Sequence, residues 1–162
     1  YQHLMLGDQL SVQRIEDVFE LSEKLLQATD ALTGHAADLG GLPAAHYVNM
    51  AGRNRMLSQR IGKFFLFREW PSLDEKIAVL TPPSCHEFES NLQTLRKTAN
   101  IPPEVAAQLR VVASQWQKFI QTLCPDLSHA ARTQHARLVM AEGERLLRGV
   151  DTTVKLFERL TK

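Results

Sequence analysis

Residues 47–70 read YVNMAGRNRMLSQRIGKFFLFREW, and this stretch carries the pattern from which the fold can be inferred. Its apolar residues recur at helical spacing, as they do on the buried face of an amphipathic helix. This expected core face consists of Met50, Leu57, Ile61, Phe64 and Phe65. With Pro43 suited to the first turn and Trp70-Pro71 ending the pattern, a long helix is predicted over Pro43–Glu69.

The same helix is strongly basic, because its only acid in this stretch is Glu69. Its basic residues are Arg53, Arg55, Arg60, Lys63 and Arg68. Arg55 shares a stripe with small or short residues, which are Ala51, Gly52, Ser58, Gln59 and Gly62. Such a stripe suits a helix–helix seam, where a guanidinium is costly unless a negative group meets it. Because no acid lies three or four residues from Arg55, a bound anion is one candidate partner. A solvated cationic face is the alternative for the cluster.

Glycine and proline residues divide the rest of the chain into further helices. The predicted helices span Asp8–Leu39, Pro43–Glu69, Ser72–Leu80, Ser84–Ala99, Pro103–Leu123 and Ser128 to the end. Breaks are expected at Gly40-Gly41, at Thr81-Pro82-Pro83, from Asn100 to Pro103 and at Pro125. No stretch alternates with period two, so no strand is expected. The expected fold class is all-α, an antiparallel up-down four-helix bundle with an additional long N-terminal helix.

Composition excludes several classes of function. A chain of 162 residues that is 44% hydrophobic fits one domain, or one domain with an appendage. A net charge of +1 gives no general reason to expect nucleic acid or an anionic membrane surface as a partner. No run approaches the roughly 20 apolar residues that cross a bilayer, so no membrane insertion by this segment is expected. Two cysteines, Cys85 and Cys124, make no disulfide framework, although one disulfide between them is open.

The segment from Asn49 to Arg60, NMAGRNRMLSQR, resembles the signature that opens the PilJ-type domain, at the N-terminal end of type IV pilus chemotaxis transducers. A looser version is the P-box of the nitrate/nitrite sensor kinases. The resemblance implies a four-helix sensor domain over residues 42–162, preceded by an N-terminal helix over residues 1–41. It also implies an extracytoplasmic, periplasmic location and a homodimer that pairs through its first and last helices.

The resemblance further implies a set of ligand-binding residues. In the nitrate sensors, the P-box arginine binds nitrate between helices of two subunits, and Arg55 occupies the matching position. Arg60 matches the second arginine of that motif, while Gly52 and Ser58 match its glycine and serine. Asn49 and Arg53 complete the expected ligand-binding set. Arg53-Asn54 before Arg55, with Leu57 and Gln59, follow the pilus-transducer version, so the resemblance leaves the identity of the ligand open.

A possible internal repeat relates the two ends of the chain. Residues 18–39 align without gaps on residues 139–160. The matched pairs are Val18/Val139, Glu23/Glu144, Leu25/Leu146, Leu26/Leu147, Asp30/Asp151 and Leu39/Leu160. Any two amphipathic helices can share such residues. The alternative is that the N-terminal helix is, or mimics, the closing helix of a preceding copy.

No pattern points to catalysis or to a cofactor. Cys85, His86 and Glu89 could lie on one helical turn, but zinc needs three or four ligands and no second pair has matching spacing. No nucleophile–base pattern, glycine-rich phosphate loop or paired carboxylates stand out, so an enzyme is not expected. The main hypothesis is a sensory module that binds a small anion, such as nitrate or nitrite, or another small ligand, and relays binding by helix displacement. The alternative is a structural or protein-interaction bundle whose basic helix meets an acidic partner.

Overall fold

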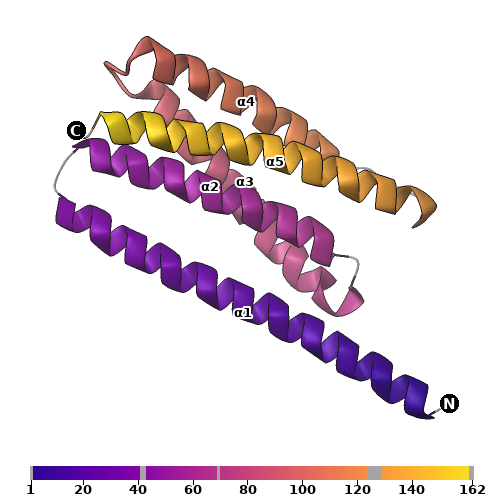
Figure 1. Cartoon of the computed structure of the whole chain (residues 1–162). Coiled ribbons are helices and arrows are strands. Elements are labelled where there is room, and N and C mark those ends of the chain that lie inside the picture. Colours follow the sequence, from indigo (N-terminus) through magenta and orange to yellow (C-terminus); the bar gives the residue numbers. More distant parts are fainter. Residues whose placement is uncertain (1, 41–42, 69, 124–128, 161–162) are drawn as a thin grey trace.

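The computed structural model describes residues 2–40, 43–68, 70–123 and 129–160, with side chains described within 12–31, 45–68, 70–123 and 135–160. This part of the chain contains five helices and no strand. The helices are α1 (Gln2–Gly40), α2 (Pro43–Phe67), α3 (Pro71–Lys97), α4 (Pro103–Leu123) and α5 (His129–Arg159). Figure 1 shows α2 to α5 as one bundle and α1 as a long helix along its outside.

The bundle is antiparallel, and α2 packs on both α3 and α5, while α4 packs on α5 and α3. The predicted fold class, a four-helix bundle with an added N-terminal helix, is therefore confirmed. Short connections force successive helices to run in opposite directions, as the loop lengths in the sequence predicted. No helix in the described part of the chain is both long enough and apolar enough to cross a lipid bilayer.

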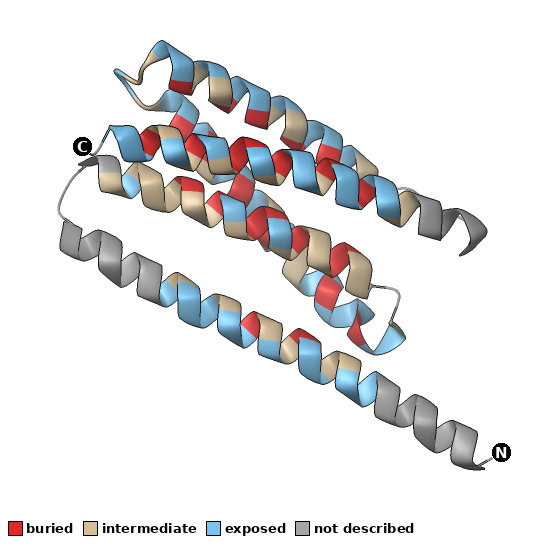
Figure 2. Cartoon of the chain, viewed as in Figure 1, coloured by how far each residue is buried: buried red, intermediate tan, exposed pale blue. Residues whose placement is uncertain are grey.

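The main core lies between α2, α3, α4 and α5. Phe88 of α3 stacks on Trp116 of α4 with ring centroids 4.0 Å apart, and Phe119 packs beside them. Buried positions recur along the inner face of each helix, while the outer faces are exposed (Figure 2). Burying each such large apolar side chain stabilises the fold by about 1.5–3 kcal/mol. This core holds α2 rigidly, and α2 carries most of the predicted site residues.

A separate, smaller apolar cluster attaches α1. Phe19 of α1 is fully buried against Phe64 of α2 and against Leu73 and Ile77 of α3. On the opposite side of α1, large apolar residues are more than half exposed, namely Val18, Leu21 and Leu25. The helix therefore has one apolar face on the bundle and a second one that nothing in the described chain covers.

The break predicted at Thr81-Pro82-Pro83 is wrong, because α3 runs without interruption from Pro71 to Lys97. Proline removes backbone donors and normally disrupts a helix interior. Here both prolines are exposed, as is Val79, so the carbonyls left without an intrahelical donor lie on the solvent side. The buried side of α3 continues past the prolines, from Ile77 to Ser84 and on to the core. Tertiary packing on that side outweighs the local preference.

Two predicted helix starts also differ. Ser84, where a new helix was expected to begin, lies inside α3, and its hydroxyl donates to the Leu80 carbonyl at 2.8 Å. Helix α1 begins at Gln2, upstream of the start expected at Asp8. The turn between α3 and α4 is as predicted, with Asn100 in the left-handed region at φ 60°, a conformation that asparagine tolerates better than most residues.

Candidate ligand-binding site

Four of the six predicted ligand-binding residues line one groove, of about 400 Å³, between α1, α2 and α5. The four are Asn49, Gly52, Arg53 and Arg55, all from α2. Around them, α1 contributes Thr29 and Asp30, while α5 contributes Asp151, Val154 and Glu158. The groove thus combines two guanidinium groups with three carboxylates. Its charge is mixed, not simply positive.

Arg53 is the more firmly held of the two arginines in the groove. Its guanidinium pairs with Asp30 of α1 through Nη1 and with Glu87 of α3 through Nε. Two carboxylates from two different helices therefore hold it in place. Each ion pair is partly exposed, so each contributes at most about 1 kcal/mol to stability. Arg53 ties α1 and α3 to α2 and has less capacity left for a ligand.

Arg55 is held much more loosely. Its side chain is 52% exposed, and its Nε lies 3.4 Å from the Asp151 carboxylate of α5. Asp151 also accepts a hydrogen bond from Lys155, at 2.7 Å between Nζ and Oδ2. This contact lowers the pKa of the Asp151 carboxyl, and Arg55 acts in the same direction. Arg55 therefore lies at the edge of the α2–α5 seam, and the negative group that meets it comes from the neighbouring helix.

Gly52 keeps the groove open. Beyond its chain neighbours and the backbone of its own helix, a Cβ atom built at this position would have no atom within 4 Å. Tight packing between helices therefore does not explain the glycine. Its absent side chain instead leaves space beside Arg55 and Asn49.

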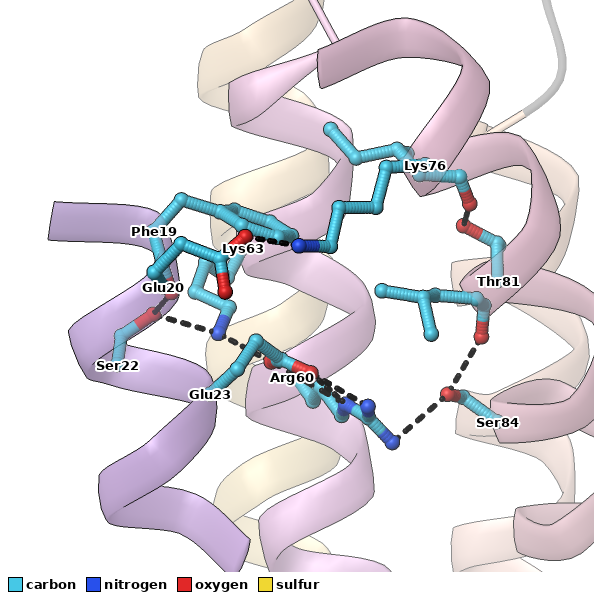
Figure 3. A network of polar contacts seen from close by, with 11 residues as sticks. Phe19, Glu20, Ser22, Glu23, Arg60, Lys63, Lys76, Thr81 and Ser84 are labelled. Carbon is cyan, nitrogen blue, oxygen red and sulfur yellow. Dashed lines mark hydrogen bonds and ion pairs between the residues drawn. The ribbon is translucent and has the colours of Figure 1, made fainter. Parts of the chain in front are cut away.

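The other two predicted residues, Arg60 and Ser58, do not line this groove. Arg60 contacts Glu23 of α1 with two of its nitrogens, with 3.1 Å between Nε and Oε2, and its side chain is only 15% exposed (Figure 3). Ser58 is buried, and its hydroxyl donates to the Arg55 carbonyl at 2.8 Å. The single site expected from the motif is thus divided between two places on α2.

Ser58 instead lines a second groove, of about 220 Å³, between α2 and α5. Gly62 and Gly143 belong to its walls, and both lie over the Phe119 ring. A Cβ on Gly143 would come within 3.3 Å of that ring. Close packing on Phe119 therefore explains Gly143, while Gly62, which the sequence placed in a helix seam, makes an ordinary contact with the same ring.

Sequence reasoning missed the acids that face the basic helix. Glu23 and Asp30 come from α1, and Asp151 comes from α5. The internal repeat was the available signal, because it pairs Asp30 with Asp151. In the structure these two aspartates line the same groove and pair with two arginines that are two positions apart on α2.

A buried asparagine was missed as well. Asn54, between the two groove arginines, donates from Nδ2 to the Phe88 carbonyl at 3.1 Å and accepts a hydrogen bond from Asn91. Because the buried amide has a partner on α3 for both its donor and its acceptor, it fixes the rotation of α2 against α3. This contact determines which way the flanking arginines project.

The cysteine-based alternatives receive no support. Within the described side chains, no group of three His, Cys, Asp or Glu residues could hold a metal ion. Cys85 lies half-buried in the middle of α3, while Cys124 lies outside the described residues. The disulfide between them stays a prediction.

Comparison with known proteins identifies one family. The family described as "Type IV pili methyl-accepting chemotaxis transducer N-term" matches residues 41–146, which is more than half of the chain. No curated protein and no solved structure matches the chain significantly.

Proposed function

The chain belongs to the PilJ family of N-terminal domains of type IV pili chemotaxis transducers, and from this premise we propose that it is a sensory module whose groove at Arg55 binds a small anionic ligand. Domains of this family are typically non-catalytic. We propose a periplasmic location, as the resemblance implies. We further propose that the sensor domain extends over residues 42–162, because Val150 and Phe157, beyond the matched segment, are buried in the same core.

The observation that carries the proposal is the state of the Arg55 guanidinium. Among the described residues, its ion pair uses Nε alone, at 3.4 Å, and its side chain is half exposed. The two terminal nitrogens remain available, and together they form the planar fork that matches a carboxylate or an oxyanion such as nitrate. Arg53 and Arg60, by contrast, each already use two nitrogens on carboxylates.

A ligand at Arg55 must compete with Asp151, and the structure makes this exchange inexpensive. When Arg55 turns toward a ligand, Asp151 keeps its contact with Lys155 at 2.7 Å. The carboxylate is therefore never left without a cation, which would be the costly outcome. The net cost of exchange is the loss of one long, partly exposed ion pair, about 0–1 kcal/mol.

The position of the groove suits a relay. Its walls come from α1, α2 and α5, so a ligand that contacts more than one wall favours one arrangement of these helices over another. Helix α1 is the wall with the smallest apolar attachment to the bundle. We propose that ligand binding changes the position of α1 relative to α2.

We also propose that the chain forms a homodimer through the exposed stripe of α1. The internal repeat supports this, because Val18 and Leu25 are exposed on α1 while their counterparts Val139 and Leu146 are fully buried on α5. Helix α1 thus presents a core-type face to solvent, and a second copy would cover it with an identical face. A preceding bundle, for which α1 is the closing helix, is the alternative cover.

The alternative function, in which the basic helix meets an acidic protein partner, has less support. Four of the five basic side chains within residues 53–68 already pair with carboxylates from α1, α3 or α5. The fifth, Arg68, donates to the Leu123 carbonyl and lies over the Phe65 ring. An acidic surface would therefore have to displace ion pairs that already exist within the chain.

A thermal-shift screen of nitrate, nitrite and acetate at constant ionic strength tests the proposal. A ligand that binds the folded state raises its Tm by mass action. We expect Arg55→Ala to abolish this rise while it changes the unliganded free energy of unfolding by about 1 kcal/mol or less. Arg110→Ala, an exposed arginine on α4, is the matched control and should keep the rise. A rise that persists in Arg55→Ala would refute the assignment.

A further inference from the structure

Two cations of α2 converge on one carboxylate of α1, away from the groove. Arg60 contacts both carboxylate oxygens of Glu23, and Lys63 Nζ lies 2.6 Å from Oε1 (Figure 3). Glu23 is the more deeply buried partner, with a side chain only 8% exposed. Arg60 lies five positions after Arg55, so their side chains project about 140° apart around the helix. The two positions are therefore distinct sites.

This cluster has an excess of positive charge. Among the described side chains, no carboxylate other than Glu23 pairs with Arg60 or Lys63. Glu20, one turn away, pairs with Lys76 at an exposed position. Burial alone would raise the pKa of the Glu23 carboxyl, but hydrogen bonds from Arg60 and Lys63 outweigh burial and lower it. One single negative charge thus balances two cations.

Arg60 is also held by groups outside α1, whereas the polar partners of Lys63 are Ser22 and Glu23 of α1. Arg60 Nη1 lies 3.4 Å from the Ser84 hydroxyl of α3, which is itself anchored on the Leu80 carbonyl. The Arg60 guanidinium also lies 5.2 Å from the Phe64 ring centroid of its own helix. If α1 moved away, α2 would still present Arg60, oriented by Ser84 and Phe64, with Lys63 three positions further along the same helix.

Helix α1 can leave this position without opening the main core. Its apolar attachment is the small cluster around Phe19, which is separate from the cluster that contains Phe88, Trp116 and Phe119. Apart from this attachment, the described part of α1 is held mainly by polar contacts, which are the partly exposed ion pairs of Glu20 and Asp30, the buried ion pairs of Glu23 and the hydrogen bond from Lys63 to Ser22. Elements with few buried apolar contacts are those that open locally at low free-energy cost.

We propose that Arg60 and Lys63, with Ser84 orienting Arg60, form an oxyanion site that the Glu23 carboxylate fills while α1 is seated, so that a divalent oxyanion and α1 compete for it. The divalent class follows from the charges, since sulfate or phosphate neutralises both cations, whereas Glu23 supplies only one charge. A monovalent anion would neutralise no more charge than the Glu23 carboxylate, which α1 holds beside the cations at high effective concentration. Occupation of the site by a divalent oxyanion releases α1 from the bundle.

Inorganic sulfate is the probe, titrated by calorimetry at ionic strength held constant with sodium chloride. If the open site is populated at about 10% or less, its apparent Kd is raised at least about tenfold. We therefore expect Glu23→Ala to bind sulfate about tenfold or more tightly than the wild type. Glu20→Ala removes the same charge from the same helix and should bind like the wild type. Equal affinity of the two variants would overturn the proposal.

Two double variants distinguish this site from the groove. Sulfate binding by Glu23→Ala should be lost when Arg60→Ala is added and kept when Arg55→Ala is added. The reverse pattern would overturn the proposal and assign sulfate to the groove. If Arg55→Ala did not abolish the rise in Tm with nitrate or acetate, the proposed function would be refuted, but this test of the second site would be unaffected.

A second variant loosens α1 without replacing Glu23 or either cation, although it removes the ring that Lys63 Nζ approaches to 5.2 Å. Phe19→Ala weakens the apolar attachment, so it should also tighten sulfate binding if α1 competes with the ion. In the wild type, sulfate should lower the protection of residues 12–31 from hydrogen exchange more than sodium chloride of equal ionic strength. Unchanged affinity in Phe19→Ala, or unchanged protection in the wild type, would overturn the competition.

Discussion

Replacing Phe19 and Phe88 by alanine, one at a time, tests how α1 is coupled to the bundle. Both side chains are fully buried, and both are the same residue type, so each truncation removes a similar apolar surface. They differ in their surroundings, because Phe88 belongs to the main core and Phe19 to the small cluster under α1. A difference in outcome therefore reports on the cluster and not on the side chain.

For Phe88→Ala we expect the full cost of a core cavity, about 3–5 kcal/mol in the free energy of unfolding. At about 2–4 °C per kcal/mol for a chain of this length, Tm should fall by roughly 6–20 °C. For Phe19→Ala, the loss cannot exceed the free energy that seats α1, because beyond that point α1 detaches and the bundle remains folded. We expect a loss of about 1–2 kcal/mol.

Urea denaturation followed by circular dichroism measures both losses, and hydrogen exchange locates them. Phe19→Ala should lower protection within residues 12–31 and leave residues 105–119 protected, whereas Phe88→Ala should lower protection throughout the bundle. An equal loss of stability in the two variants, with protection falling everywhere in both, would refute the reasoning. Helix α1 would then unfold cooperatively with the bundle and could not act as its movable part.

Three further predictions follow from individual contacts. Because the pKa of the Glu23 carboxyl is lowered, its ion pairs stabilise the attachment of α1 fully above pH 4.5, the ordinary value, and this stabilisation is lost as the pH falls through the lowered pKa. The protection of residues 12–31 from hydrogen exchange should therefore fall with acid in the wild type and much less in Glu23→Gln, and equal pH dependence would contradict this. Gly52→Ala should raise the free energy of unfolding by about 0.5–1 kcal/mol, whereas Gly143→Ala, whose Cβ would come within 3.3 Å of a phenylalanine ring, should gain less. Urea denaturation compares the two variants, and a larger gain for Gly143→Ala would contradict this. Leu25→Glu should dissociate the proposed dimer in sedimentation velocity, and a wild type that is monomeric at high micromolar concentration would exclude it.

Most of the architecture could be predicted from local patterns. The spacing of Leu57, Ile61 and Phe65 identifies the buried face of α2, and Asn100 marks the turn before α4. The exception is the Pro82-Pro83 pair, which local rules assign to a helix break. The rule failed because the prolines lie on the solvent side of α3, while the packed side continues unbroken.

The candidate site could be predicted only in part. The motif located Asn49, Gly52, Arg53 and Arg55, which do line one groove, but it placed Arg60 and Ser58 with them. Residues five positions apart on a helix lie on different faces, so one motif can serve two places. Asp30 and Asp151 appeared in the sequence only as a matched pair of a repeat, with no indication that they face the same groove.

The sequence by itself determined the all-helical class, the antiparallel order of the bundle and the basic character of α2, because these depend on periodicity and on short connections along the chain. Only the tertiary structure decided which carboxylate meets which cation. That choice depends on the rotation of α1 and α5 about α2, which packing around Phe19, Asn54 and Phe119 sets at long sequence separation. It leaves Arg55 half exposed on a loosely held aspartate and closes Arg60 against Glu23.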